Sequence, residues 1–337
     1  MGDTSLIQTR TADEAALTRA FEAAFDAAVS TQGATAPNPP VGCAVLDAEG
    51  RVLAVASHAA AGQAHAEAAA IALCREAGAL DRIHTLVVTL EPCNHTGRTP
   101  PCVRSILSTP AKRVLIGAAD PNISVAGGGA RALRDAGLEV AFLGGAAASA
   151  SRRLLAPFAK RALGGTPWVT VKRAFDARGG MIPPTGAKTF TSAASLDLAH
   201  ALRRRADAVL TGIGTVLADA PLFTVRRLAD HPGKRRALVA MDRSDRLPAA
   251  YVTAAAARGL DARGETDLVA ALRRLASEGV LEVLVEAGPR LSAAVLDGPL
   301  WDEAITIHAG DGGPDRVVRD YRAGEPAWER FDVLRHR

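Results

Sequence analysis

The chain reads His-Ala-Glu at residues 65–67 and Thr-Leu-Glu-Pro-Cys-Asn-His-Thr-Gly-Arg-Thr-Pro-Pro-Cys at residues 89–102. The first stretch leads into an alanine-rich segment, residues 66–76, which predicts a helix that ends before Gly78. The second stretch begins at the end of an apolar run, residues 85–90, which predicts a strand, and a further helix is expected over residues 103–107. Alternation of strands and helices at this spacing predicts an α/β fold.

The segments on either side of these stretches continue the alternation. Apolar residues at helical spacing predict a helix over residues 12–30, which the proline-rich segment at residues 37–40 separates from the next element. Strands are expected at 41–46, 52–56, 113–116 and 138–143, and a helix at 129–136. Together these elements predict an α/β sandwich with a largely buried sheet.

A length of 337 residues suits two domains better than one hydrophobic core. The first domain is predicted over residues 1–150, followed by a helical connector over residues 151–165 and a second domain over residues 166–337. The second half again alternates, with strands expected at 168–171, 208–210, 237–241, 283–285 and 304–307 and helices at 195–205, 266–279 and 291–296. We therefore expect a second α/β domain.

The composition is typical of a globular protein and narrows the classes of partner. No apolar run approaches the roughly 20 residues that a membrane-spanning helix needs, and Met1 to Arg10 lacks the regions of a signal peptide. We therefore expect a cytoplasmic protein with no membrane partner. The net charge of +4 comes mostly from scattered arginines, and only 4% of residues are aromatic, which argues against nucleic acid as a partner. Binding of an anionic small substrate accounts for the net positive charge equally well.

His65, Cys93 and Cys102 fall at the ends of predicted strands and helices, where side chains converge at the edge of a sheet. Zinc prefers thiolate and imidazole ligands, and a catalytic zinc keeps three protein ligands and a water. Glu67 is suited to carry protons beside such a metal, and zinc deaminases require His-x-Glu followed by Pro-Cys in this order. The sequence therefore predicts a zinc-dependent deaminase with Glu67 as its catalytic residue.

Two other interpretations of the same residues remain open. The two predicted cysteine ligands, with eight residues between them, also suit a structural zinc site, for which His95 is an available fourth ligand. They are equally compatible with free thiols. Cys43 and Cys74 fall within apolar segments and are expected in the core. The sequence assigns no role to His58 or His84.

Five segments together point to a known family: Pro37-Asn38-Pro39-Pro40-Val41-Gly42, residues 65–67, residues 89–102, Asp120-Pro121-Asn122 and Val125-Ala126-Gly127. They resemble the bifunctional deaminase/reductase of riboflavin biosynthesis, because the generic zinc deaminase pattern ends in Pro-Cys-x-x-Cys and the longer loop here is specific to that family. The resemblance implies a cytidine-deaminase-like α/β/α sandwich. It also implies hydrolysis of 2,5-diamino-6-ribosylamino-4(3H)-pyrimidinone 5′-phosphate at C2, giving 5-amino-6-(5-phosphoribosylamino)uracil and ammonia.

The same resemblance implies substrate contacts for five residues. Asn38 is expected to hydrogen-bond the pyrimidine edge. His95 and Arg98, in the loop between the cysteines, suit the ribose phosphate, since arginine presents a planar fork to phosphate oxygens. Asp120 and Asn122 are expected to close the pocket. The alternative for Asn38 and Asn122 is a role in turns, because each stands beside prolines.

The second half resembles the reductase domain of the same family, which has a dihydrofolate-reductase-like α/β fold and uses NADPH. The resemblance rests on Lys172, residues 207–212, residues 215–226, Asp242 and residues 285–288. A glycine-containing turn after a strand lets backbone N–H groups approach a cofactor phosphate. The cofactor-binding residues that the resemblance implies are Lys172, Thr215, Asp219, Arg226, Glu286 and Gly288.

Several positions of the second half depart from that family. Asp-Ala-Arg-Gly at residues 176–179 stands where Ser-Leu-Asp-Gly is expected, residues 189–190 lack an expected tryptophan, and Leu196 replaces an arginine that would anchor the substrate's phosphate. After His308 the usual closing strands are expected to be reduced to a polar tail. These departures predict weak or absent reduction by NADPH, with the domain kept as a scaffold or a dimerisation surface.

Four functional alternatives follow from the sequence. The first is the bifunctional riboflavin enzyme, and the second is a deaminase of a specialised azapteridine pathway such as that of toxoflavin, which the altered reductase positions favour. The third is a nucleic-acid-editing deaminase, against which the proline-rich loop and the scarce aromatic residues argue. The fourth is a non-catalytic zinc protein. A homodimer or higher homo-oligomer is expected.

Overall fold

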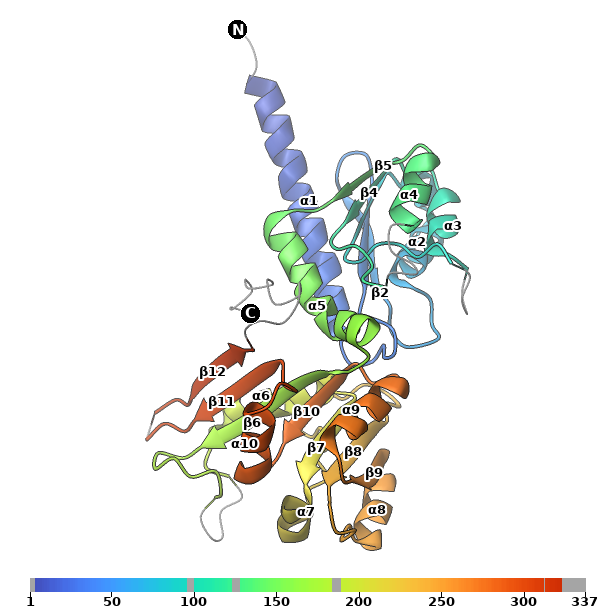
Figure 1. Ribbon diagram of the computed structural model, residues 1–337. Coiled ribbons are helices and arrows are strands. Elements are labelled where there is room, and N and C mark those ends of the chain that lie inside the picture. Colours follow the sequence, from blue (N-terminus) through green and yellow to red (C-terminus); the bar gives the residue numbers. More distant parts are fainter. Residues whose placement is uncertain (1–3, 96–99, 123–127, 184–188, 312, 323–337) are drawn as a thin grey trace. The chain divides into compact units, whose positions relative to one another are not determined.

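The computed structural model describes residues 4–95, 100–122, 128–183, 189–311 and 313–322 (Figure 1). The chain divides into two compact units, of which the first runs to Leu163 and the second begins at Gly164. Most of the predicted connector at residues 151–165 lies in a helix that ends at Gly164. No helix in the described ranges combines the length and the hydropathy needed to cross a membrane.

The first unit is built on a five-stranded sheet. Its elements are α1(Thr4–Ser30), β1(Gly42–Leu46), β2(Val52–Ser57), α2(Ala66–Glu76), the 3₁₀ turn η1(Leu80–Arg82), β3(Thr85–Val88), α3(Cys102–Leu107), β4(Arg113–Ile116), α4(Gly128–Asp135), β5(Glu139–Phe142) and α5(Gly145–Gly164). The strands lie in the order β2-β1-β3-β4-β5. Strand β1 is antiparallel to both its neighbours, whereas β3, β4 and β5 are parallel. Every helix and strand predicted for this half is present, and α1 begins at Thr4 rather than at residue 12.

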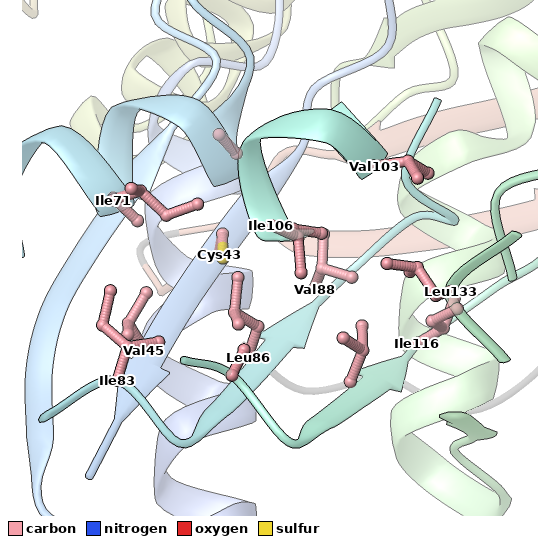
Figure 2. Packing of buried hydrophobic residues seen from close by; sticks show 14 of the residues in the cluster. Cys43, Val45, Ile71, Ile83, Leu86, Val88, Val103, Ile106, Ile116 and Leu133 are labelled. Carbon is pink, nitrogen blue, oxygen red and sulfur yellow. The ribbon is translucent and has the colours of Figure 1, made fainter. Parts of the chain in front are cut away.

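Alternate residues of the central strand β1 serve opposite faces of this sheet, as the two-residue period of a strand requires. Cys43 and Val45 pack with buried residues of α2, α3 and α4, as Figure 2 shows. Ala44 and Leu46 pack with residues of α1 and α5 on the other face. All four side chains are buried. Helices therefore cover both faces of the sheet, and the predicted sandwich and the core position of Cys43 are confirmed.

Gly42 lets helix α1 lie directly on strand β1. A Cβ atom at residue 42 would lie 1.8 Å from the carbonyl oxygen of Ala24, far inside van der Waals contact. We expect Gly42→Ala to displace α1 and to lower the free energy of unfolding by about 2–4 kcal/mol, as measured by urea denaturation. The matched control is Gly144→Ala, since a Cβ at residue 144 meets open space. Equal stability of the two variants would contradict this close packing.

The second unit is built on a seven-stranded sheet. Its elements are β6(Trp168–Phe175), α6(Ala193–Arg205), β7(Ala208–Gly212), α7(Ile213–Asp219), β8(Arg236–Met241), α8(Ala249–Ala256), β9(Leu260–Glu265), α9(Leu268–Ser277), β10(Glu282–Glu286), α10(Pro289–Leu296), β11(Glu303–His308) and β12(Arg316–Tyr321). The strand order is β12-β11-β6-β10-β7-β8-β9. All neighbouring strands are parallel except β11 and β12. The carboxyl ends of six strands therefore share one edge, where open parallel sheets bind ligands.

Strand β12 corrects the expectation that a polar tail follows His308. The segment pairs antiparallel with β11 along its whole length, from Arg316 to Tyr321. Most of its side chains are exposed, so the strand is held by backbone hydrogen bonds and lacks the apolar alternation that predicts a strand. The sequence pattern also does not indicate α7, α8 or β9, of which β9 carries three charged residues.

Candidate functional site

The three predicted metal ligands lie at element ends in the first unit. His65 is the residue that precedes α2, with an extended backbone, and Cys102 is the first residue of α3. Cys93 lies in the segment after β3 and accepts a hydrogen bond from the backbone N–H of Cys102, at 3.4 Å. The local sequence explains these positions, because Pro92, Pro100 and Pro101 interrupt regular structure on both sides of the loop.

The ligand atoms of these residues form one compact cluster. The His65 Nδ1 atom lies 3.5 Å from the Cys93 Sγ atom and 3.3 Å from the Cys102 Sγ atom, and all three ligand atoms lie within 4.8 Å of one another. Bond lengths of about 2.3 Å to sulfur and about 2.05 Å to nitrogen place two ligands of a tetrahedral zinc roughly 3.5 Å apart. The cluster therefore has the spacing and the chemistry that zinc requires.

The electrostatics of the two thiols also suit a cation. The hydrogen bond between the two thiols lowers the pKa of Cys93 to about 4 and raises that of Cys102. The hydrogen bond with Cys93 likewise raises the pKa of His65. Because the Cys93 and Cys102 thiols lie so close together, only one of them ionises easily when no cation lies between them. A divalent cation between them removes that penalty and favours both thiolates.

Glu67 lies in the first turn of α2 with its side chain almost fully buried, at 3% exposure. Its Oε2 atom accepts a hydrogen bond from the Cys102 thiol at 3.3 Å. Burial raises the pKa of this carboxyl, which brings it toward the range where a proton carrier works best. The structure thus places one buried carboxyl group beside the ligand cluster.

His95 does not belong to that cluster. Over the residues that the structure describes, the group of metal-ligating side chains consists of His65, Cys93 and Cys102, and His95 is exposed. A structural zinc site would need a fourth protein ligand. The arrangement therefore favours the three-ligand type of site, which leaves one position for a water.

The predicted substrate residues fall into two groups around the cluster. Asn38 shares a hydrogen bond with His58, at 3.1 Å between Nδ2 and Nε2. Asp120 is half-buried, and the charges of His95 and Cys93 act on the pKa of its carboxyl. Burial raises the pKa of Asp120, and its carboxylate accepts the backbone N–H of Asn122 at 2.9 Å. Arg98 lies outside the described residues.

Glu91, to which no sequence motif assigns a role, holds the segments of the second group in place. Its Oε1 atom accepts the N–H of Ala130 at 3.0 Å, and its Oε2 atom accepts the N–H of Asp120 at 3.3 Å. The start of α4 also lies close to the segment that carries Cys93, since a Cβ atom at Gly129 would lie 1.8 Å from the carbonyl oxygen of Pro92. The only sequence signal for Glu91 was its place directly before Pro92.

A second cluster of charges lies at the carboxyl edge of the sheet in the second unit. Lys172 and Glu286 are cross-strand partners on β6 and β10, with Nζ and Oε2 3.7 Å apart. Arg203 of α6 binds both oxygens of Glu286, at 2.5 and 2.9 Å. Although burial opposes ionisation, the charge of Arg203 lowers the pKa of Glu286. No sequence pattern singles out Arg203, because it lies within a run of three arginines.

The other predicted cofactor residues lie at helix ends and in the loop after α7. Gly288 precedes α10, and a Cβ atom there would lie 3.6 Å from the hydroxyl of Thr215 in α7. Asp219 ends α7. The backbone N–H of Arg226 donates to His200 at 2.9 Å. Two residues of this loop have left-handed backbones, Ala220 with φ of 43° and Phe223 with φ of 49°.

Two family models match the chain. Residues 13–118 match the cytidine and deoxycytidylate deaminase zinc-binding region, and residues 167–310 match the RibD C-terminal domain. Together the two matches cover more than half of the chain. The first match contains the His65, Cys93 and Cys102 cluster, and the second contains Lys172 and Glu286. The predicted fold class, a deaminase sandwich followed by a reductase-type α/β domain, is confirmed.

Several full-length relatives match both halves. The riboflavin biosynthesis protein RibD of Mycobacterium tuberculosis is 37% identical over 302 residues, covering 88% of this chain and 86% of that protein. The Escherichia coli RibD is 31% identical over 311 residues, 82% of each chain. Acinetobacter baumannii RibD, form 1, matches with a TM-score of 0.75 and 30% identity over 88% of each chain.

A solved structure from Thermotoga maritima, titled a diaminohydroxyphosphoribosylaminopyrimidine deaminase/5-amino-6-(5-phosphoribosylamino)uracil reductase, matches with a TM-score of 0.76. It is 29% identical, and the match covers 89% of this chain and 88% of that one. These comparisons do not support the azapteridine alternative, and they confirm the family that the sequence motifs predict. The chain is a member of the bifunctional RibD family of riboflavin biosynthesis.

Proposed function

We propose that the first unit hydrolyses 2,5-diamino-6-ribosylamino-4(3H)-pyrimidinone 5′-phosphate to 5-amino-6-(5-phosphoribosylamino)uracil and ammonia. One observation carries the proposal: three zinc-type ligands converge within 4.8 Å, and the buried carboxyl of Glu67 lies 3.3 Å from one of them. The names of the relatives support this substrate. His65, Cys93 and Cys102 would hold the metal, and Glu67 would act as the catalytic residue.

The chemistry needs a nucleophile and a proton carrier. Zinc, when held by His65, Cys93 and Cys102, would lower the pKa of a bound water to about 7 and so would supply hydroxide at neutral pH. Glu67 takes up the proton that the attacking water releases and passes it to the ring nitrogen beside C2. Glu67 would then move the remaining hydroxyl proton from the oxygen on C2 to the amino group, so that the C2–N bond breaks, ammonia leaves and the oxygen stays on C2 as a carbonyl.

The substrate contacts are part of the same proposal. Asn38 would contact the pyrimidine edge, and His95 and Arg98 would contact the ribose phosphate. Asp120 and Asn122 would close the pocket from the segment that Glu91 holds. The influence of the charges of His95 and Cys93 on the pKa of Asp120 supports this grouping.

We infer that the second unit is the reductase half of the pair, with NADPH bound at the carboxyl edge of its sheet. Lys172, Glu286 and Arg203 supply charge there. Thr215, Asp219, Arg226 and Gly288 are the further residues proposed to contact the cofactor. NADPH, when bound, would donate a hydride to the ribosyl side chain of the deaminated product, and a proton from solvent would complete the reduction. A homo-oligomer, the absence of a nucleic-acid partner and a cytoplasmic location stay predictions.

Incubation of the zinc-loaded chain with the diaminopyrimidinone phosphate tests both halves of this proposal. Ammonia release without NADPH reports deamination alone, and loss of NADPH absorbance in the presence of the deaminated product reports reduction. Ammonia release that outlasts removal of zinc, or no release from the zinc-loaded chain, would refute the first half. A higher, salt-sensitive affinity for RNA than for the mononucleotide would favour the nucleic-acid alternative.

We expect reduction by NADPH to be slow, with a turnover below about 1 per second, toward the low end of the ordinary enzyme range. Leu196 on α6 carries no charge where the family resemblance implies a phosphate anchor. The Asp176 carboxylate accepts the backbone N–H groups of Arg178 and Gly180, at 2.9 and 2.7 Å, so it is engaged within its own turn. The loss of NADPH absorbance over time, in the presence of the deaminated product, measures this turnover number. Faster turnover would show that these departures do not impair the site.

A further inference from the structure

His58 is a buried histidine beside the metal ligands that the chemistry above does not use. His58 directly follows β2 in the chain. Its side chain is 2% exposed, and both ring nitrogens have partners. The Nδ1 atom lies 3.0 Å from the carbonyl oxygen of Ala64, and the Nε2 atom lies 3.1 Å from the amide nitrogen of Asn38. Both ring nitrogens of His58 are therefore committed to specific neighbours.

The two contacts of His58 fix where its proton lies. A carbonyl oxygen only accepts hydrogen bonds, so the Nδ1 atom must carry the hydrogen that faces Ala64. The Asn38 atom that faces Nε2 is the amide nitrogen, which donates, so Nε2 is the bare, accepting nitrogen of a neutral imidazole. The carbonyl oxygen of that amide is left to face the other side.

Asn38 is held beside the metal ligands by this arrangement. The His58 ring packs edge-on against the ring of His65, with 5.3 Å between their centroids and 73° between their planes. The backbone of Asn38 is fixed as well, because its N–H donates to the carbonyl of Thr35 at 2.8 Å. Both the position and the amide orientation of Asn38 are thus defined next to His65.

We propose that His58 is a positioning residue that locks the Asn38 amide with its carbonyl oxygen toward the substrate, so that the site selects a pyrimidine edge carrying a hydrogen-bond donor. This inference rests on the proposed function, in which Asn38 contacts the pyrimidine. The proposed substrate carries such donors as its ring N–H and amino groups. Without His58 the amide is free to turn and to present its N–H₂ group, which repels a donor.

Two replacements of His58 separate its two contacts. The substitution His58→Asn keeps a donor near the position of Nδ1 and removes the acceptor that faces Asn38. The substitution His58→Gln keeps an acceptor oxygen near the position of Nε2. We expect His58→Asn to lower kcat/KM for deamination about ten-fold, mainly through KM and with zinc content unchanged. His58→Gln should recover much of this loss. His84→Asn is the matched control, since His84 contacts Thr85 next to it in sequence.

A double-mutant cycle tests whether His58 acts through Asn38. On an Asn38→Ala background, His58→Asn should cause little further loss, because there is no amide left to orient. Losses that add fully in the double variant would overturn the proposal, as would equal losses in His58→Asn and His58→Gln. Loss of zinc in His58→Asn would assign His58 to support of His65 and would also overturn it.

The tautomer of His58 provides a readout that does not depend on turnover. In the zinc-loaded full chain with ¹⁵N-labelled histidine, long-range ¹H–¹⁵N NMR spectra distinguish a protonated ring nitrogen from a bare one. We expect a protonated Nδ1 and a bare Nε2, with the Nε2 signal shifted by Asn38→Ala. A bare Nδ1 in the wild-type chain would overturn the orientation argument even if deamination is normal. If deamination fails but the expected tautomer is seen, the proposed function is refuted and the positioning is not.

Discussion

Replacement of Glu67 by alanine is expected to lower the turnover number for deamination by about 10²–10⁴-fold while zinc stays bound. The ligands His65, Cys93 and Cys102 are unchanged in this variant, so the metal retains its protein contacts. What is lost is the buried carboxyl group 3.3 Å from Cys102, and general acid–base catalysis contributes rate factors of this size. Zinc content and ammonia release, measured on the same sample, test the two parts of the expectation.

The control for Glu67 lies on the same helix. Glu76 ends α2 and is exposed, so Glu76→Ala removes the same side chain from a position away from the cluster. It should leave both zinc content and turnover unchanged. A Glu67→Ala protein with near-normal turnover would mean that this carboxyl carries no proton in the reaction. Zinc binding without any deamination in the wild-type chain would instead favour a non-catalytic metal site.

Replacement of Cys102 by serine is expected to abolish deamination by releasing the metal. The serine hydroxyl stays protonated at neutral pH, whereas zinc binds the thiolate form of cysteine. We expect the affinity for zinc to fall by more than about 100-fold, which exceeds the effect of changing groups that merely hydrogen-bond to a ligand. Because Cys102 also begins α3 and touches both His65 and Glu67, the melting temperature should fall as well.

Cys74 provides the matched control for Cys102. It is equally buried, but it packs in the apolar core of α2 with Ile71 and Leu86. Cys74→Ala should lower stability modestly and keep one zinc per chain. Treatment of the wild-type chain with a strong chelator should abolish ammonia release, and added zinc should restore it. Full activity of the chelated chain, or of Cys102→Ser, would contradict a catalytic metal at this site.

Local patterns in the sequence were sufficient where a residue's role depends on its neighbours along the chain. The helix over residues 66–76 was predicted with its observed bounds, because alanine favours helix and Gly78 ends it. The order of His65, Cys93 and Cys102 also predicted a cluster that the structure brings together. Strand β12 was predicted wrongly as a polar tail, because an exposed edge strand held by backbone pairing carries little apolar signal.

Residues that act through other residues could not be found in the same way. His58 is twenty positions from Asn38, and Arg203 is far from Glu286 in sequence, yet each pair is joined by hydrogen bonds. Glu91 likewise accepts backbone N–H groups from two later segments. No spacing rule connects such residues, because folding sets their separation in space independently of their separation in the chain.

The sequence by itself determined the two-part α/β organisation and the chemical type of the metal ligands, because strand and helix periods and ligand identity are properties of neighbouring residues. Only the tertiary structure decided that three ligand atoms approach to within 4.8 Å, that Glu67 is buried beside them, and that His58 faces Asn38. Burial and hydrogen-bond direction depend on packing between segments distant in sequence, and these two properties set the pKa of a carboxyl and the orientation of an amide.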